Sequence, residues 1–275
     1  SIRRQRQMCI RDRFHGIVGF DPDNANIGYL IENPNGEDKA GLYEFDFTTG
    51  KIGKKLFHAE DADVMGIQLH SIPGNDKLVA ARYSGRIMER HWFDEDEKAL
   101  YEALEKQIPY SYQVGISSRS LDGKSMIVTN RGPRDPGSFW LVKDGKLAKL
   151  GSRNPLLNPE QLADVEYIRY KARDGRVIPG YVTKPKGTGP FPLIVLPHGG
   201  PQVNEIITFD EWGQLLANAG YMVLQPQYRM SVGWGQDHFD AAYGEHGGTM
   251  QDDKDDGALY LVEQGLVDPL SLIHI

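Results

Sequence analysis

The hydrophobic pattern changes character about half-way along the chain. In the first half, short apolar runs alternate with turns that contain glycine, asparagine and aspartate, which predicts many short β-strands. In the second half, apolar runs of strand length are separated by segments of helical period. The chain is therefore predicted to contain an all-β region followed by an α/β region.

A turn followed by a strand recurs three times in the all-β region. The copies lie about 50 residues apart, a spacing found in propeller blades, and begin at Phe20, Ile72 and Leu121. The first and third copies continue into a second strand and a hairpin turn, Thr49-Gly50 in one and Asp144-Gly145 in the other. This order predicts a partial β-propeller of about three blades; the alternative is a β-sandwich whose segments resemble one another by chance.

The middle copy is less regular than the other two. Residues 98–104 fit either a helical turn or a strand. The acidic run before them, residues 94–97, is interpreted as a solvated loop rather than a metal site. The turns Asp122-Gly123 and Asp144-Gly145 are interpreted as structural, so the all-β region receives no catalytic candidate.

The α/β region opens with a predicted β-hairpin, in which residues 165–170 and 177–182 alternate apolar and polar positions around Asp174-Gly175. Residues 192–229 then predict a strand, a turn, a helix and a second strand. The turn is His198-Gly199-Gly200-Pro201, whose glycines let the backbone bend and expose its N–H groups. In such a βαβ unit the turn lies at the carboxyl end of the first strand, where open α/β sheets carry their chemistry.

The helix and second strand of this unit carry two further expectations. The helix is expected to stop at Gly220 and to bury one apolar face, made up of Trp212, Leu215, Leu216 and Ala219. The second strand, residues 221–224, is expected to leave an unpaired sheet edge and hence poor solubility.

A second helix is predicted after Gly247-Gly248. Its first turn is expected to hold four aspartates, where they favour the positive end of the helix dipole; they are Asp252, Asp253, Asp255 and Asp256. A calcium site is the less favoured alternative, because no glycine-centred loop of alternating oxygen ligands is present.

Composition and charge exclude several classes of partner. The 275 residues are enough for one large or two ordinary domains, and 40% of them are hydrophobic. No apolar run approaches the roughly 20 residues of a membrane helix, so no membrane partner is expected. The net charge of −7 argues against a nucleic-acid partner.

Both ends of the chain look foreign to the rest. Residues 3–12 and residues 270–275 can each be translated from a short DNA string. The second string is the reverse complement of the last part of the first string, continued by two bases. Together they resemble a transposase-type sequencing adapter translated at both ends of an insert, so they are left out of the fold prediction. Under this interpretation Cys9, the only cysteine, is not native. Cytoplasmic and periplasmic localisation both stay open, and further blades are expected upstream.

Five motifs follow one another in a fixed order through the α/β region. They are HGGP after PLIVLP, AxxGYxVxxPxYR at 217–229, SxGxG at 231–235, GxxGGxMxxD at 244–253, and the aspartate-rich helix. HGGP alone is a weak signal, but the ordered set resembles the prolyl oligopeptidase family, and within it the acylaminoacyl-peptidase and dipeptidyl-peptidase-like branch. The resemblance is close over residues 160–269 and covers the all-β region only by architecture.

The resemblance implies a fold and a chemistry. Such proteins carry an N-terminal β-propeller over a C-terminal α/β-hydrolase domain, which cleaves short peptides through a Ser-Asp-His triad without a metal or organic cofactor. The turn His198, Gly199 and Gly200 then contributes to the oxyanion hole, with the Gly200 N–H as the preferred donor. His198 stands where some relatives have a tyrosine that donates through its hydroxyl, and it is expected either to donate through a ring nitrogen or to pack. The implied boundaries are residues 1–13 and 270–275 as adapter-derived, 14–158 as partial propeller, and 159–269 as the N-terminal part of the hydrolase.

The chain departs from the family pattern at three positions. Met230 stands where glycine usually follows the arginine, Gln227 replaces a frequent asparagine, and His246 replaces an aromatic residue. All three are expected to affect loop geometry and to leave the class unchanged.

No G-x-S-x-G nucleophile turn occurs in the sequence. The nearest approach, around Ser231, lacks the first glycine and runs into another glycine-rich stretch rather than a helix, so Ser231 is not expected to be the nucleophile. His238 and His246 precede the expected serine, which is the wrong order for a triad histidine, and both are expected to lie in loops. The triad is therefore expected beyond residue 269, and this fragment is predicted to be inactive. A carboxylesterase on the same fold and a non-catalytic propeller/hydrolase-like binding protein are the alternatives.

Overall fold

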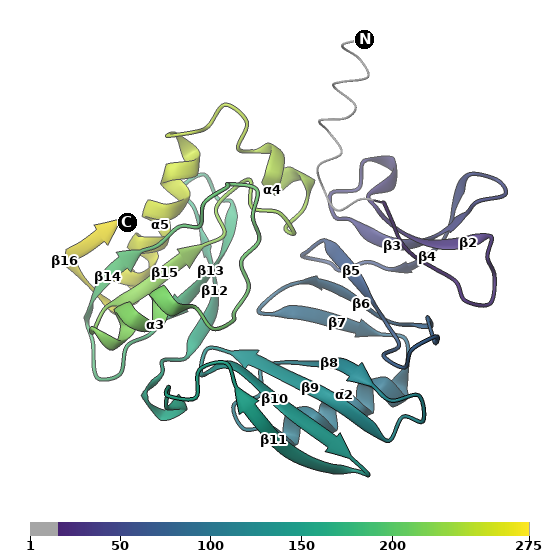
Figure 1. The fold of residues 1–275 in the computed structure, drawn as a ribbon. Helices are drawn as coiled ribbons and strands as arrows, with labels where there is room; N and C mark the ends of the chain where they lie inside the picture. The colour runs from purple at the N-terminus through teal and green to yellow at the C-terminus, as the bar shows by residue number, and fades with distance from the viewer. Residues whose placement is uncertain (1–15, 275) are drawn as a thin grey trace.

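Three antiparallel sheets make up the first half of the chain in the computed structural model, which describes residues 16–274 (Figure 1). The first consists of β1 (Gly16–Phe20), β2 (Ile27–Glu32), β3 (Gly41–Asp46) and β4 (Lys51–Phe57). The second consists of β5 (Val64–Leu69), β6 (Leu78–Ser84) and β7 (Met88–Trp92). The third consists of β8 (Gln113–Arg119), β9 (Ser125–Gly132), β10 (Asp135–Lys143) and β11 (Lys146–Ser152). In each sheet, strands that follow one another in sequence pair with one another, as the predicted repeat requires. The adapter interpretation of residues 1–13, Cys9 included, lies outside the described residues.

The predicted hairpin turns are present. β10 and β11 are joined at Asp144-Gly145, where φ is +49° and +74°. Positive φ at both central residues is the backbone that suits a tight hairpin, and it favours glycine at the second position. The interpretation of Asp144-Gly145 as a structural turn therefore fits its backbone conformation.

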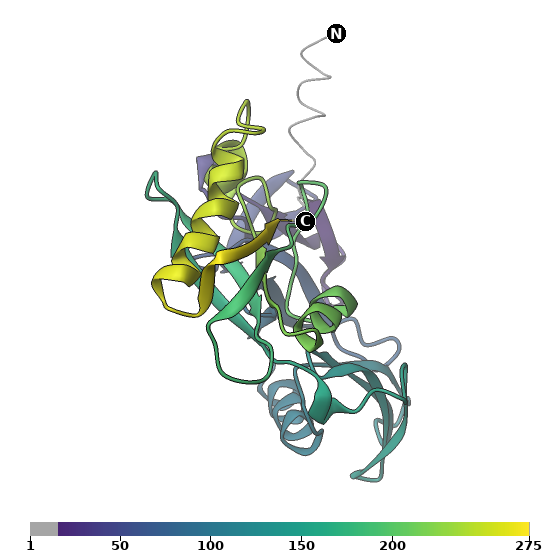
Figure 2. The ribbon, with the colours of Figure 1, turned by 90° about the vertical axis from the view of Figure 1, so that its left-hand side faces the viewer.

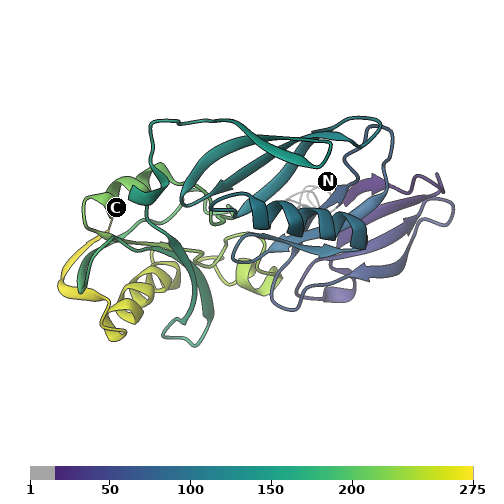
Figure 3. The ribbon, with the colours of Figure 1, turned by 90° about the horizontal axis from the view of Figure 1, so that it is seen from below.

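The middle sheet has three strands, and the helix α2 (Glu95–Gln107) follows them. This settles the ambiguity at residues 98–104 in favour of a helix. Figure 3 shows α2 lying between the middle and third sheets, and its buried Tyr101 and Leu104 join the core of the third sheet. In the chain, α2 follows β7 at the point where each of the other two sheets has its fourth strand.

The acidic run at residues 94–97 is the start of α2, so its interpretation as a solvated loop was wrong. The Asp94 side chain caps the helix by accepting from the N–H groups of Asp96 and Glu97. Glu97 is buried, and its Oε1 lies 2.7 Å from Nη1 of Arg119. Asp94 therefore caps the start of α2, and Glu97 links the helix to the third sheet through Arg119.

A five-stranded mixed sheet forms the second half, in the order β12-β13-β15-β14-β16. Its strands are β12 (Val165–Lys171), β13 (Val177–Thr183), β14 (Phe191–Val195), β15 (Met222–Pro226) and β16 (Val267–His274). The helices of this half are α3 (Glu211–Asn218), α4 (Gln236–Asp240) and α5 (Thr249–Glu263), and the short 3₁₀ turns of the chain are η1 (Pro34–Gly36) and η2 (Pro159–Gln161). The hairpin β12–β13 is antiparallel, while β14 and β15 are parallel and joined through α3, so the predicted hairpin and βαβ unit are confirmed. Figure 2 shows α3 and α5 on opposite faces of the sheet.

The sequence predicted that β15 leaves an unpaired sheet edge, and this prediction was wrong. It pairs with β14 on one side and with β13 on the other. The open edges belong to β12 and β16. β16 runs through residues 270–274 and pairs with β14 at Val267, Leu272, Ile273 and His274.

The predicted buried face of α3 was also wrong. Trp212 is 67% exposed and Leu215 is 60% exposed, whereas Gly213, Gln214 and Ala217 are buried. The Gln214 amide explains this rotation, because it donates to the backbone carbonyls of Pro133 and Ala163 and accepts from the Ala163 N–H. Three hydrogen bonds to buried backbone groups outweigh the burial of one more apolar side chain.

The segment at residues 233–237, which ends in the first two residues of α4, links the two halves of the chain through hydrogen bonds. The Asp63 N–H donates to the carbonyl of Gly233, and the Asp63 carboxylate accepts from the Gly235 N–H at 3.0 Å. Asp38 accepts from the next two N–H groups of the segment, one on its carbonyl and one on its carboxylate. Gly235 has φ +98°, and a β-carbon there would collide with Lys39 and Asp38. The backbone of this segment is thus bonded directly to residues of the first half.

Candidate active site

The turn His198-Gly199-Gly200-Pro201 follows the carboxyl end of β14, as predicted. Gly199 and Gly200 are exposed. Gly200 has φ +126°, and a β-carbon on it would lie 2.8 Å from Cγ2 of Val203. The conformation of this turn therefore requires glycine at position 200.

The two glycine N–H groups are unoccupied donors. Within residues 16–274, neither the Gly199 N–H nor the Gly200 N–H donates to any acceptor. Two adjacent free amides on an exposed turn are suited to bind an oxygen atom that carries negative charge.

His198 is held in place by the segment that follows β15. Its ring stacks on Tyr228 with centroids 4.7 Å apart, and the Tyr228 hydroxyl donates to the His198 carbonyl at 2.6 Å. The Nε2 atom of His198 lies 2.9 Å from Oγ of Ser231. Burial lowers the pKa of His198, which keeps the imidazole neutral near pH 7.

The Ser231 hydroxyl has two partners. Ser231 is fully buried, and its Oγ lies 2.6 Å from the carbonyl of Tyr228 and 2.9 Å from Nε2 of His198. His198 Nδ1 lies 3.0 Å from the Gly199 carbonyl, which can only accept, so the single proton of the neutral ring serves either Gly199 from Nδ1 or Ser231 from Nε2. The pair resembles a serine–histidine dyad in distance, but its serine is fully buried and lacks the G-x-S-x-G turn.

A buried ion pair between Arg229 and Asp253 also fixes the segment that follows β15. The Asp253 carboxylate of α5 accepts from the backbone N–H and from Nε and Nη2 of Arg229, at 2.9, 2.8 and 2.6 Å. Asp174 adds a second carboxylate 3.0 Å from Arg229 Nη2. Hydrogen bonds to Asp253 raise the pKa of Arg229 further above its ordinary value.

The aspartates of α5 therefore act differently from the prediction. Only Asp252 lies in the first helical turn. Asp253 pairs with Arg229, and Asp256 pairs with Arg173 through contacts of 2.6 to 3.2 Å. Asp253 and Asp256 therefore pair with the buried Arg229 and the exposed Arg173 rather than interacting with the helix dipole.

Met230 has a backbone conformation that glycine adopts more easily. Its φ is +82°, in the left-handed region, and its side chain is buried among Tyr228, Phe239 and Met250. The departure from the family pattern thus falls at a position with positive φ, where apolar packing accompanies the less favourable backbone.

The two other histidines singled out in the sequence lie apart from this chemistry. His238 is buried in α4 rather than in a loop, with Nε2 3.1 Å from the Gln227 carbonyl and 3.2 Å from the Tyr228 carbonyl. Burial lowers its pKa to about 4. His246 is exposed in the loop before α5, as expected.

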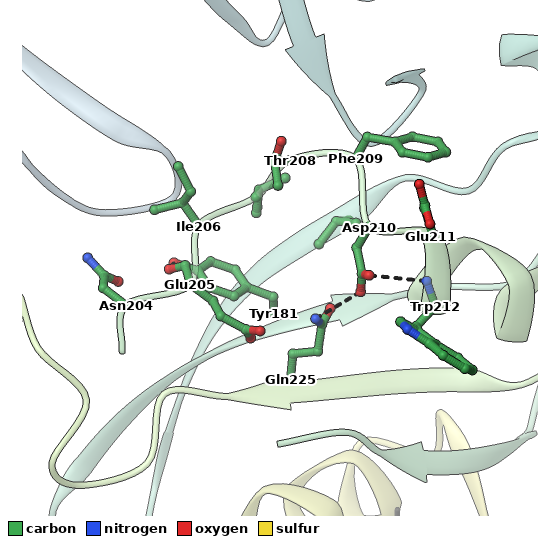
Figure 4. Close-up of a pocket in the computed structure, with 12 residues that line it drawn as sticks. Tyr181, Asn204, Glu205, Ile206, Thr208, Phe209, Asp210, Glu211, Trp212 and Gln225 are labelled. Atoms are coloured by element: carbon green, nitrogen blue, oxygen red, sulfur yellow. Dashed lines mark hydrogen bonds between the residues drawn. The ribbon is translucent and has the colours of Figure 1, made fainter. Parts of the chain in front are cut away.

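A cavity of about 440 Å³ is lined by residues 204–212, which follow the turn in sequence, and lies on the α3 face of the sheet (Figure 4). Asp210 caps α3 there, accepting from the N–H groups of Trp212 and Gly213 and from the amide of Gln225. Glu205 also lines the cavity, and no periodic pattern or motif in the sequence distinguishes it. Burial, followed by the nearby Asp210, raises the pKa of Glu205 to about 7.

Among the described residues there is no group of three or more histidine, cysteine, aspartate or glutamate side chains arranged to hold a metal ion. None of the helices between residues 16 and 274 is long and apolar enough to cross a membrane.

Residues 207–274 match the sequence profile described as Prolyl oligopeptidase family. Dipeptidyl aminopeptidase BIII of Pseudoxanthomonas mexicana is 31% identical over 269 residues, which is 92% of this chain and 38% of that protein. The chain belongs to the prolyl oligopeptidase family. The resemblance stated from the ordered motifs is thereby confirmed.

Two further comparisons agree with this result. Dipeptidyl peptidase family member 6 of Caenorhabditis elegans is 26% identical over 90% of this chain and 36% of that protein. The solved structure of puromycin hydrolase superposes with a TM-score of 0.67 at 18% identity, covering 94% of this chain and 40% of that one. The likeness to puromycin hydrolase concerns the fold alone. The chain spans 36% to 40% of the length of these two proteins and of dipeptidyl aminopeptidase BIII.

Proposed function

We propose that the chain is part of a serine peptidase that hydrolyses peptide bonds of short peptides, and that the turn at His198, Gly199 and Gly200 forms part of its oxyanion hole. The observation that carries this proposal is the pair of free, exposed N–H groups at the carboxyl end of β14. Such donors stabilise the negative charge that develops on a carbonyl oxygen during acyl transfer. The Gly200 N–H is the preferred donor. The names of the relatives, among them a dipeptidyl aminopeptidase, support a peptidase.

In this proposal the three antiparallel sheets are about three blades of a partial β-propeller. Residues 159–269 are the N-terminal part of an α/β-hydrolase domain, and the catalytic serine, aspartate and histidine lie outside this chain. His198 is a positioning residue, since its two ring nitrogens contact Ser231 and the Gly199 carbonyl and its ring stacks on Tyr228.

The first test uses the chain as it is. A fluorophosphonate probe, read by intact-mass spectrometry, is expected to leave it unlabelled, because Ser231 is fully buried and lacks the G-x-S-x-G turn that exposes a nucleophile. Covalent labelling of Ser231 would contradict the proposal.

The second test uses the longer gene from which the chain comes. Sequence beyond Pro269 is expected to encode a G-x-S-x-G turn within a few tens of residues, and its absence there would rule out the peptidase. The expressed protein is then assayed with dipeptidyl and N-acyl-aminoacyl chromogenic substrates and with a simple ester. Faster turnover of the ester than of every peptide substrate would favour a carboxylesterase.

A matched pair of glycine variants tests the oxyanion role in that longer protein. Gly200→Ala is expected to lower kcat by about 100-fold, because the added β-carbon displaces the turn that aims the N–H group. Gly199→Ala keeps its N–H, and its β-carbon meets no atom within 4 Å, so it is the control. Equal activity of the two variants would argue against Gly200 as the donor.

A further inference from the structure

The third strand of the middle antiparallel sheet has an open edge. In the first and third sheets, the third strands β3 and β10 pair with the fourth strands β4 and β11. The middle sheet ends at β7, which pairs with β6 alone among the described strands, and α2 follows it in the chain. One edge of β7 therefore lacks the backbone partner that β3 and β10 have.

The register of β6 and β7 shows which backbone groups of β7 are already used. Just after β7, the Phe93 N–H donates to the carbonyl of Val79, and the register continues along β7 without a bulge. Facing residues of an antiparallel pair alternate between hydrogen-bonded and non-hydrogen-bonded positions. Glu89 and His91, four and two residues before Phe93, are therefore bonded to β6.

The alternate residues of β7 turn their backbone N–H and C=O groups to the open edge. These residues are Met88, Arg90 and Trp92. Within residues 16–274, none of their three N–H groups donates to the backbone of another element. An unpaired row of this kind is a ready template for a further strand.

A cavity of about 380 Å³ runs along this edge of β7. Its size is within the range of ligand pockets, about 300–1,000 Å³. One wall consists of residues 86–90 with Trp92, and Ser111 and Tyr112 complete the lining. The other wall is one face of α2, at the helical spacing i, i+3, i+4 and i+7, made up of Lys98, Tyr101, Glu102 and Glu105. The cavity is thus a groove between a strand edge and a helix.

The two walls of this groove are held together by contacts at Arg90. Its Nε donates to the side chain of Gln68 at 3.0 Å, and its Nη2 donates to the carbonyl of Val114 at 2.6 Å. Its guanidinium lies 4.7 Å from the ring centroid of Tyr101, and the ring centroids of Trp92 and Tyr101 are 5.0 Å apart. The groove is therefore formed in advance, which lowers the cost of binding.

The groove carries no net charge, because three cationic and three acidic side chains line it. They are Arg86, Arg90 and Lys98, and Glu89, Glu102 and Glu105. Main-chain hydrogen bonds rather than net charge therefore decide what the groove binds.

We propose that the groove between β7 and α2 binds an extended, uncharged peptide segment from outside the protein, which adds to β7 as its fourth strand. The main chain of the peptide bonds to the free groups of Met88, Arg90 and Trp92, as in other cases of strand addition to a sheet edge. Because α2 forms the second wall, a single strand fits here, whereas the edge of a whole sheet from a second copy does not. This binding does not depend on the proposed peptidase activity.

Hydrogen exchange in the 275-residue chain, followed residue by residue by NMR, provides the test. The probe is a hexapeptide of alternating valine and threonine, acetylated and amidated, because both residues favour the extended backbone. With about nine tenths of the sites occupied, exchange at Met88, Arg90 and Trp92 is expected to slow about tenfold. Glu89 and His91 are already bonded to β6 and are expected to change less than about twofold. This alternation along one strand is the signature of strand addition.

A modified probe isolates the contribution of the main chain. The same hexapeptide with an N-methyl group on every residue has no backbone N–H to donate, although it keeps the same side chains. It is expected not to bind.

Two variants of one residue test the edge from the protein side. Met88→Pro removes one outward N–H, which a strand edge tolerates, and is expected to weaken binding at least about tenfold because its ring also enters the path of the peptide. Met88→Ala keeps the N–H and is expected to stay within about threefold of the wild type. An amide spectrum shows whether each variant is folded, and the N-methylated probe decides the question without any variant.

Four results would overturn the proposal: no binding of the unmodified probe, equal binding of the N-methylated probe, protection at a different strand edge, or a folded Met88→Pro variant that binds like the wild type. Protection of the three N–H groups without peptide, in step with dimer formation in light scattering, would also overturn it and assign the edge to a second copy. None of these results affects the oxyanion proposal, which the glycine variants of the longer protein test.

Discussion

The two faces of the mixed sheet treat buried carboxylates in opposite ways. On the α5 face, Asp253 receives three hydrogen bonds from Arg229. On the α3 face, the buried oxygen of Glu205 receives no hydrogen bond within the described residues, and no cation lies beside it in the cavity. A carboxylate that is fully paired holds two elements together, whereas an unpaired one lowers stability without any structural gain.

This difference separates a carboxylate whose charge is paired from one whose charge is not. The ion pair of Arg229 fixes the segment that supports the turn at His198. Glu205 has a strongly shifted pKa and lies in a cavity lined by the loop that follows that turn, a combination that is typical of functional sites. The comparison makes three predictions, from the largest expected effect to the smallest.

Asp253→Asn is expected to cause the largest loss of stability. It removes the carboxylate that pairs with a buried guanidinium, and breaking a buried pair from one side costs about 3–5 kcal/mol. Chemical denaturation of the variant measures the loss. Asp255→Asn, on an exposed position of the same helix, is the control and is expected to stay within about 0.5 kcal/mol of the wild type. A similar loss in both variants would remove the distinction between the paired site and the helix surface.

Glu205→Gln is expected to stabilise the protein at pH 8, by roughly 1–3 kcal/mol. The folded-state pKa of about 7 lies above the ordinary 4.5, so the folded protein keeps a proton that the unfolded chain releases. The wild type therefore loses stability as the pH rises from 4.5 to about 7, and the variant lacks this loss. Thermal unfolding at pH 4 and pH 8 measures it, and the two proteins are expected to differ little at pH 4. A variant less stable than the wild type at pH 8 would mean that Glu205 has a stabilising partner.

Trp212→Ala is expected to have the smallest effect on stability, within about 0.5 kcal/mol, because the side chain is 67% exposed. The melting curve of the variant, compared with that of the wild type, tests this prediction. A loss of more than about 1 kcal/mol would make Trp212 a structural residue.

The sequence predicted the βαβ unit and the glycine turn because both depend on local signals. A short apolar run, two glycines and a segment of helical period followed by Gly220 specify strand, turn and helix without reference to the rest of the chain. The repeat of turns and strands was visible for the same reason.

The errors arose where distant contacts decide the outcome. The burial of Gln214 depends on carbonyls at Pro133 and Ala163, and the position of β15 inside the sheet depends on its pairing with β13. Asp253 and Asp256 were assigned to the helix dipole because their arginine partners are far away in sequence. Glu205 could not be singled out at all, since its property is the absence of a partner inside a cavity.

The segment at residues 233–237 has a consequence for exchanging parts between relatives. Three of its N–H groups, those of Gly235, Gln236 and Asp237, donate to Asp63 and Asp38 in the other half of the chain. A mixed-sheet half produced alone would leave these N–H groups without their carboxylate and carbonyl acceptors. A chimaera that joins it to the β-sheets of another family member would therefore need an acidic residue at both positions and space for Gly235. The two halves are separate in architecture, but they are not interchangeable modules.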